Sequence, residues 1–289
     1  ITFKVIIFKL QLCIVYFFGG VAKLKSDWLL EAQPLKIWLT ARTDMPVLGW
    51  LFEYDITPYL FSWSGMLYDL AIPFLLWSRK TRPIAYILVV IFHILTYALF
   101  NIGMFPWLMM FGSLVFITHE EWGKVFSTFN LKLSIKGLSN YNTKPIILPF
   151  LILFFVFQSL FPLRHFLLTD NVLWTENGFR FAWHVMIMEK NGFTEFIVED
   201  NKSNKRWKEY PSNRLTTIQE KQMSFQPDMI WQYAQFLKED YKTKGYSDIS
   251  IYVNSKVSLN GRTSRRFINE NSDLLEIKDV DEIYNHVLK

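Results

Sequence analysis

The chain has 289 residues, a length that allows two domains of about 100–200 residues each. Its hydrophobic fraction is 51% and its formal net charge is +5, with Lys and Arg spread along the sequence rather than clustered. Nucleic-acid binding is therefore not expected, because it usually shows as a concentrated basic patch or stripe.

The apolar residues are unevenly distributed. Residues 1–168 are dense in Phe, Leu, Ile and Trp, whereas residues 190–289 are dense in Lys, Glu, Asp, Asn and Ser. We therefore expect a transmembrane helical domain at 1–168 and an extramembrane domain at 169–289. Because the sequence begins at Ile1, directly before an apolar run, we expect it to be the N-terminally truncated part of a larger membrane protein.

Five apolar stretches predict about five membrane spans, since a span needs about 20 mainly apolar residues. The fourth stretch is short, and it could be tilted, re-entrant or joined to the third by the break at Asn101, Ile102 and Gly103. The stretches are residues 5–21, 58–77, 83–100, 104–118 and 145–163.

The orientation follows from the basic residues in short loops, which are enriched on the cytoplasmic side of membranes. Residues 78–82 carry three basic side chains, and the loop after the fourth stretch carries Lys124, Lys132, Lys136 and Lys144. With five crossings, the C-terminal domain then lies on the extracytoplasmic side. We expect an integral protein of a bacterial inner membrane, with the lipid bilayer as its first partner.

In the C-terminal domain, apolar residues recur both at the spacing of a strand and at the spacing of a helix. Apolar residues alternate over 179–187, which predicts a strand, and Asn191-Gly192 predicts a hairpin turn into a return strand at 193–198. An apolar stripe at helical spacing follows Pro227 and ends at Gly245, and a further strand at 251–259 ends at Asn260-Gly261. These elements predict a small α+β domain.

Motifs that bind metals or nucleotides are absent from the sequence. There is no GxxxxGK[ST], GxGxxG or HExxH, and the five histidines are never two at ligand spacing. We therefore expect no metal and no nucleotide cofactor.

Three ionisable residues in or beside the spans are candidates for function, since such residues are costly in a bilayer. Asp69 and His93 lie in the middle of the second and third stretches, where they could form a purely structural pair or part of a site. Lys23 follows Gly19-Gly20 at the end of the first stretch. It could be an interfacial anchor or a general base, because an apolar boundary disfavours the charged form of an amine.

Four sequence blocks, in this order, resemble the vitamin K-dependent γ-glutamyl carboxylase family. Lys23 lies before Leu24 and upstream of Asp27-Trp28, as the catalytic lysine of that family does. The blocks are residues 14–28, Leu67-Tyr68-Asp69-Leu70, residues 92–106, and Trp174-Thr175 through Trp183-His184-Val185-Met186.

The resemblance implies a two-part reaction. The lysine deprotonates a reduced vitamin K-type quinol, which reacts with O2 to give a strong alkoxide base and finally an epoxide. That base removes a γ-proton from a glutamate side chain in a protein or peptide, and the carbanion attacks CO2. The resemblance also implies Lys23 as the catalytic base, a quinone pocket with Asp69, His93 and Thr96, and a glutamate-substrate region with Trp174, Phe179 and Trp183.

Some positions depart from the animal enzyme. Phe179, Ala182 and Met188 stand where that enzyme has Tyr, Ser and His, which leaves carboxylation of glutamate open. Thr96 stands where the family commonly has Asn. The family also has an active-site histidine upstream of this sequence, so we expect the fragment alone to be inactive.

Two other classes of function remain open from the sequence. One is a non-catalytic membrane module whose soluble domain binds a partner. The other is a quinone-binding redox subunit without carboxylation.

Overall fold

The computed structural model describes residues 3–128, 147–168 and 170–289. The chain divides into two compact units, of which one is helical and the other holds a β-sheet. The helical unit comprises Ile1–Leu163 and Phe181–Val185, and the second unit comprises Arg164–Arg180 and Met186–Lys289. A helical membrane-type region followed by a small α+β domain was predicted, and this architecture is confirmed.

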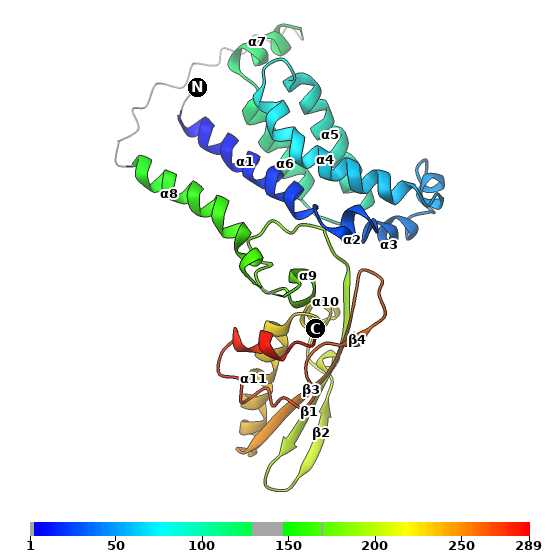
Figure 1. Ribbon diagram of the computed structural model, residues 1–289, viewed down its shortest axis with the longest axis vertical. Coiled ribbons are helices and arrows are strands. Elements are labelled where there is room, and N and C mark those ends of the chain that lie inside the picture. Colours follow the sequence, from blue (N-terminus) through cyan, green and yellow to red (C-terminus); the bar gives the residue numbers. More distant parts are fainter. Residues whose placement is uncertain (1–2, 129–146, 169) are drawn as a thin grey trace. The chain divides into compact units, whose positions relative to one another are not determined.

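Long apolar helices build the first unit (Figure 1). Helix α1 packs along α4, α5 packs against α4, and α6 packs against α5 and α1. Large side chains fill the space between these helices, among them Tyr16, Ile72 and Phe116. The helices are α1 (Phe3–Ala22), α2 (Ser26–Leu29), α3 (Leu35–Thr40), η1 (Gly49–Glu53), α4 (Thr57–Trp77), α5 (Arg82–Leu99), α6 (Phe105–Ser113), η2 (Leu114–Phe116), α7 (His119–Thr128) and α8 (Ile147–Leu160).

Four of the helices in the described part of the chain are long and apolar enough to cross a membrane. They begin and end close to the first, second, third and fifth predicted spans, and they are Lys4–Ala22, Thr57–Trp77, Arg82–Leu99 and Ile147–Leu167. Their outward faces carry many exposed Leu, Ile and Phe side chains, which suits a lipid surrounding.

The fourth predicted span is shorter than expected. The apolar helix Phe105–Phe116 covers only about 18 Å at 1.5 Å per residue, against a hydrocarbon core of about 30 Å. Its chain nevertheless passes from one end of the bundle to the other, since Phe100 contacts Trp38 of α3 whereas Phe116 contacts Trp77 at the end of α4.

The basic residues used to predict the orientation are only partly described. Arg82 is buried and donates from Nη1 to both carboxylate oxygens of Glu121, at 2.9 and 2.7 Å, so its charge is compensated. Lys132, Lys136 and Lys144 lie outside the described residues. The predicted orientation therefore stays a prediction.

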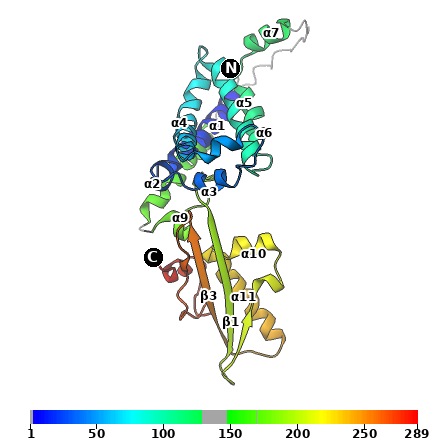
Figure 2. The same cartoon turned by 90° about the vertical axis from the view of Figure 1, so that its right-hand side faces the viewer.

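A four-stranded antiparallel sheet forms the centre of the second unit, with the strand order β2-β1-β3-β4. Figure 2 shows α10 and α11 alongside β1 and β3, which they contact. The elements are η3 (Phe161–Leu167), α9 (Val172–Thr175), β1 (Lys190–Asp200), β2 (Lys205–Glu209), η4 (Pro211–Asn213), α10 (Thr217–Met223), α11 (Pro227–Thr243), β3 (Ile249–Leu259), β4 (Arg265–Arg266) and η5 (Glu282–His286).

Helix α11 and strand β3 match the sequence patterns that predicted them. The predicted apolar stripe of α11 is buried, with Ile230 and Leu237 fully covered. The helix ends before Gly245, whose φ of 92° is easy only for glycine. Strand β3 ends at Leu259, and the Asn260 and Gly261 that follow both have positive φ, as the predicted turn requires.

The hairpin predicted at Asn191-Gly192 is wrong. Strand β1 runs straight through these residues and pairs with β3 along its whole length, from Lys190 opposite Leu259 to Asp200 opposite Ile249. The predicted strand at 179–187 is also wrong, because Phe181, Trp183 and Met186 have positive φ angles that interrupt an extended chain. The alternation there lies on turns rather than on a strand.

Gly192 has a different role from the one predicted. A Cβ atom on it would lie 2.5 Å from the carbonyl oxygen and 2.7 Å from the carbonyl carbon of Ser224, which follows α10. Both neighbours are backbone atoms and cannot rotate away. The glycine therefore allows the end of α10 to approach the sheet.

We predict that Gly192→Ala destabilises the second unit by about 1–3 kcal/mol, as is typical of overpacking in a closely packed region. Urea unfolding of the full chain in detergent measures this loss. Asn191→Ala, on the neighbouring exposed position of β1, is the matched control and should change the free energy of unfolding little. Equal stability of Gly192→Ala and the parent protein would contradict the close approach.

Candidate active site in the helical unit

A buried ion pair joins α1 to α4. Lys23 directly follows α1, and its Nζ lies 2.6 Å from Oδ2 of Asp69 in the middle of α4. The amine also donates to the backbone oxygen of Gly19 at 3.0 Å. The two side chains are only 10% and 11% exposed, so the pair is screened from solvent.

Two glycines precede Lys23 and make room for this contact. A Cβ atom on Gly20 would lie 2.7 Å from the side chain of Leu70 and 3.0 Å from its backbone nitrogen, so only glycine fits there. A Cβ atom on Gly19 would lie 3.7 Å from Oδ2 of Asp69. The Gly-Gly pair therefore allows a close approach of α4 to α1.

Trp28 covers the pair from α2. Its ring centroid lies 5.6 Å from the Lys23 amine, within the range of a cation–π contact. Its Nε1 donates to the carbonyl oxygen of Ser62 at 2.8 Å, and the Ser62 hydroxyl donates back to the Trp28 carbonyl. These bonds fix the indole against α4.

Lys25 is the nearest competing lysine. It lies between α1 and α2 and is half-buried. Burial lowers the pKa of Lys25 from its ordinary value, while the nearby Asp27 opposes that change. A test of Lys23 as a base must therefore separate the two lysines.

A second polar cluster lies between α1, α5 and α6. The hydroxyl of Tyr16 lies 3.0 Å from Nε2 of His93 and 3.4 Å from the hydroxyl of Ser113. Thr96, which the resemblance places with His93, donates its hydroxyl to the His93 carbonyl at 3.1 Å within the same helix.

The partner predicted for Asp69 is wrong. We expected Asp69 and His93 to face each other, but in the described part of the chain Asp69 bonds to Lys23 and His93 bonds to Tyr16. Both residues are buried, and each is costly unpaired in an apolar interior. The partner of His93 is Tyr16 on α1, and the partner of Asp69 is Lys23 directly after α1.

Tyr68 lies beside this cluster. Its ring stacks on Phe92 at a centroid distance of 3.9 Å and stands edge-on to Tyr16 and His93. Among the described residues, Tyr68 Oη and His93 Nδ1 are buried without a hydrogen-bond partner. Two buried polar atoms without a partner are unusual in a closely packed interior, which makes this cluster a candidate site.

Tyr16, Tyr68 and Trp28 were not selected from the sequence. Tyr16 lies two helical turns before Lys23, a spacing that puts both on one face of α1. Tyr68 is adjacent to Asp69 in the sequence. Both positions can be read from the sequence, but tyrosine is neutral near pH 7, and the candidates were chosen among ionisable residues that are costly in a bilayer.

The residues predicted to contact glutamate fall in both units. Trp174 is 3% exposed, donates from Nε1 to the carbonyl oxygen of Leu288 at 2.7 Å, and stands edge-on to Phe267. It belongs to the core of the second unit. Phe179 and Trp183 are half-buried, and Trp183 belongs to the segment Phe181–Val185 that is grouped with the helical unit.

Comparison with known protein families now adds to this geometry. Residues 2–122 match the HTTM domain, a helical unit, and residues 143–287 match the vitamin K-dependent gamma-carboxylase, lumenal domain. No solved structure matches the chain. The fold and both matches define a membrane protein with an extramembrane α+β domain. The chain belongs to the vitamin K-dependent gamma-carboxylase family.

We predict that Gly20→Ala lowers the stability of the helical unit by about 1–3 kcal/mol, because the added methyl group forces α1 away from α4. Thermal unfolding in detergent measures the change. Gly112→Ala in α6 is the matched control, since a Cβ atom there would meet Leu12 only at an ordinary 3.6 Å. A Gly20→Ala protein as stable as the Gly112→Ala protein would contradict the tight crossing of α1 and α4.

Proposed function

We propose that this protein is a membrane enzyme of the carboxylase family in which Lys23 is the general base that takes a proton from a reduced vitamin K-type quinol. The transmembrane part comprises residues 1–168 and the extracytoplasmic part comprises residues 169–289, in a bacterial inner membrane. The observation that carries the proposal is the buried amine of Lys23 in contact with Asp69 at 2.6 Å.

The carboxylate of Asp69 can accept the proton of the Lys23 ammonium group. A lysine acts as a base only when it is neutral, and a charged pair is costly in an apolar interior. For Lys23 to act as a base, its ammonium group must first pass a proton to the carboxylate of Asp69, which turns the charged pair into a neutral amine and a carboxylic acid. Asp69 would thereby leave Lys23 neutral and able to accept the proton of the quinol.

The cluster around His93 supplies the features that a quinol site needs. The orphaned Nδ1 of His93 and hydroxyl of Tyr68 are the polar atoms that would bond to the quinol oxygens, and the stacked rings of Phe92 and Tyr68 form an aromatic surface beside them. The hydroxyl of Thr96 donates to the carbonyl oxygen of His93 within α5. When bound, the quinol would supply the electrons that reduce O2, with one oxygen atom kept in the epoxide and the other released as water.

Carboxylation of glutamate is the second half of the proposed reaction, with CO2 as co-substrate and a glutamyl protein or peptide as acceptor. We assign Phe179 and Trp183 to the substrate region, because both are half-buried on an irregular segment rather than sealed in a core. Trp174 lacks this feature, because its indole is buried in the core of the second unit by Leu288 and Phe267.

A second candidate function is quinol oxidation without carboxylation. The observation that favours it is the apolar character of the proposed substrate region, where Phe179 and Ala182 offer no polar group to a glutamate carboxylate. An epoxidation assay with and without a glutamyl peptide and labelled CO2 separates the two functions.

Lys23→Arg tests the base directly, because arginine keeps the charge but does not lose its proton in proteins. We predict that this substitution lowers quinol-dependent epoxide formation by about 10²–10⁴-fold, the usual contribution of general acid–base catalysis. The assay uses the full-length natural protein in detergent with quinol and O2.

Two matched variants sharpen the result. Lys25→Arg tests the competing lysine, and Lys36→Arg changes a lysine whose amine bonds to the hydroxyl of Tyr59. Both should retain epoxidation. Activity that survives Lys23→Arg but disappears in Lys25→Arg would assign the base to Lys25, and activity that survives all three substitutions would make Lys23 an anchor.

A further inference from the structure

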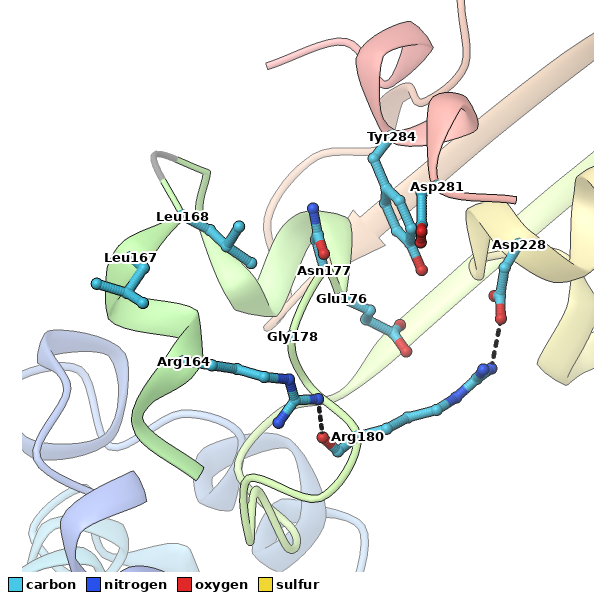
Figure 3. A pocket seen from close by; sticks show the side chains of 10 residues that line it. All are labelled: Arg164, Leu167, Leu168, Glu176, Asn177, Gly178, Arg180, Asp228, Asp281 and Tyr284. Carbon is cyan, nitrogen blue, oxygen red and sulfur yellow. Dashed lines mark hydrogen bonds and ion pairs between the residues drawn. The ribbon is translucent and has the colours of Figure 1, made fainter. Parts of the chain in front are cut away.

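The second unit contains a cavity of about 430 Å³ that no step of the proposed reaction uses. The end of η3 forms one wall, the segment after α9 forms another, and residues of α11 and η5 close the far side (Figure 3). Its volume is within the range of about 300–1,000 Å³ that is common for small-ligand sites. The lining residues are Arg164, Leu167, Leu168, Glu176, Asn177, Gly178, Arg180, Asp228, Asp281 and Tyr284.

One end of the cavity is rich in hydrogen-bond acceptors. Oε1 of Glu176 accepts from Lys190 at 2.8 Å, and Oδ2 of Asp228 pairs with Arg180 at 2.7 Å. Among the described residues, no hydrogen bond reaches the other oxygen of either carboxylate, although the two side chains are only 11% and 6% exposed. Asp281 has no cationic partner in the described part of the chain.

The phenol of Tyr284 lies at the same end (Figure 3). Burial raises the pKa of Tyr284 to about 12, and the charge of Asp228 adds to this effect. Burial likewise raises the pKa of Glu176, against the influence of Lys190. Both changes follow from low solvation and nearby negative charge, and an added cation would relieve the second of these.

The acceptor-rich end suits an ammonium group better than a metal ion. Among the described residues, no group of three or more His, Cys, Asp or Glu side chains has the geometry to hold a metal. A primary ammonium group has three N–H donors, which match the open oxygens of Glu176 and Asp228 and the carboxylate of Asp281.

The opposite end of the cavity is cationic and lies where a membrane span ends. Arg164 and Leu167 belong to the last residues of the span-length segment Ile147–Leu167. Arg164 donates to the backbone oxygen of Arg180, which fixes its guanidinium beside the cavity (Figure 3). Guanidinium groups are well suited to phosphate, and residues at the end of a span lie at the level of lipid headgroups.

Exposed apolar side chains surround this end. Leu167 is 86% exposed and Phe166 is 67% exposed, although both are large hydrophobic residues. Such side chains are costly in water and are stabilised at the boundary between headgroups and acyl chains. The volume of the cavity admits a headgroup but not the acyl chains, which would remain in the bilayer.

We propose that this cavity binds the zwitterionic headgroup of an ethanolamine-type phospholipid, with its ammonium group at Glu176, Asp228 and Asp281 and its phosphate at Arg164. The site would bind one class of lipid to the extramembrane unit. A choline headgroup has no N–H donor and a glycerol headgroup has no ammonium, so neither satisfies the acidic end. This proposal does not depend on the carboxylase reaction.

Native mass spectrometry of the full chain in detergent tests the selectivity, with equal amounts of ethanolamine, choline and glycerol phospholipids that share the same acyl chains. We predict that the ethanolamine lipid is retained about tenfold over the choline lipid, as the loss of a hydrogen bond to a charged group implies. Asp281→Asn should abolish most of this preference. Tyr284→Phe changes a second residue of the same wall and should lower the preference as well.

Glu239→Gln is the matched control, because Glu239 is exposed on α11 and does not line the cavity. It should leave the preference unchanged. Equal retention of the ethanolamine and choline lipids, or an unchanged preference in both cavity variants with intact folds, would overturn the proposal. Equal competition by soluble phosphoethanolamine or by a short lysine peptide would assign the site to a soluble ligand and overturn the lipid assignment.

Discussion

The contact between Lys23 and Asp69 is the constraint on which the helical unit depends. It places two opposite charges 2.6 Å apart between α1 and α4, at a point where Gly20 lets the two backbones approach. Removing either partner leaves the other charge buried and unpaired, which is the most costly state for such a group. Trp28 covers the pair and keeps solvent from it. The same isolation is the feature on which the proposed role of Lys23 as a general base rests.

Local patterns in the sequence predicted the parts of the fold whose signal is itself local. The apolar length of α1, α4 and α5 alone indicates helices of membrane length. The stripe of α11 and the alternation of β3 each carry a period that one element satisfies by itself. The resemblance of four ordered blocks indicated the family, to which the chain belongs by its two domain matches.

Features that depend on contacts between distant segments were not predictable in the same way. Asn191-Gly192 has the composition of a hairpin turn, yet pairing with β3 and the approach of Ser224 make it part of a strand. Asp69 has two possible partners at similar depth, and only the crossing of α1 and α4 selects Lys23 over His93. The acceptor-rich cavity combines residues from η3, α11 and η5, which no sequence spacing connects.

A double-mutant cycle on Lys23 and Asp69 measures the central interaction most directly. We predict that Lys23→Met and Asp69→Leu each lower the free energy of unfolding in detergent by about 3–5 kcal/mol, because each leaves one buried charge unpaired. The double variant should lose clearly less than the sum of the two single variants, since both charges are then gone. Losses that simply add in the double variant would show that the two residues do not interact, and would contradict the account.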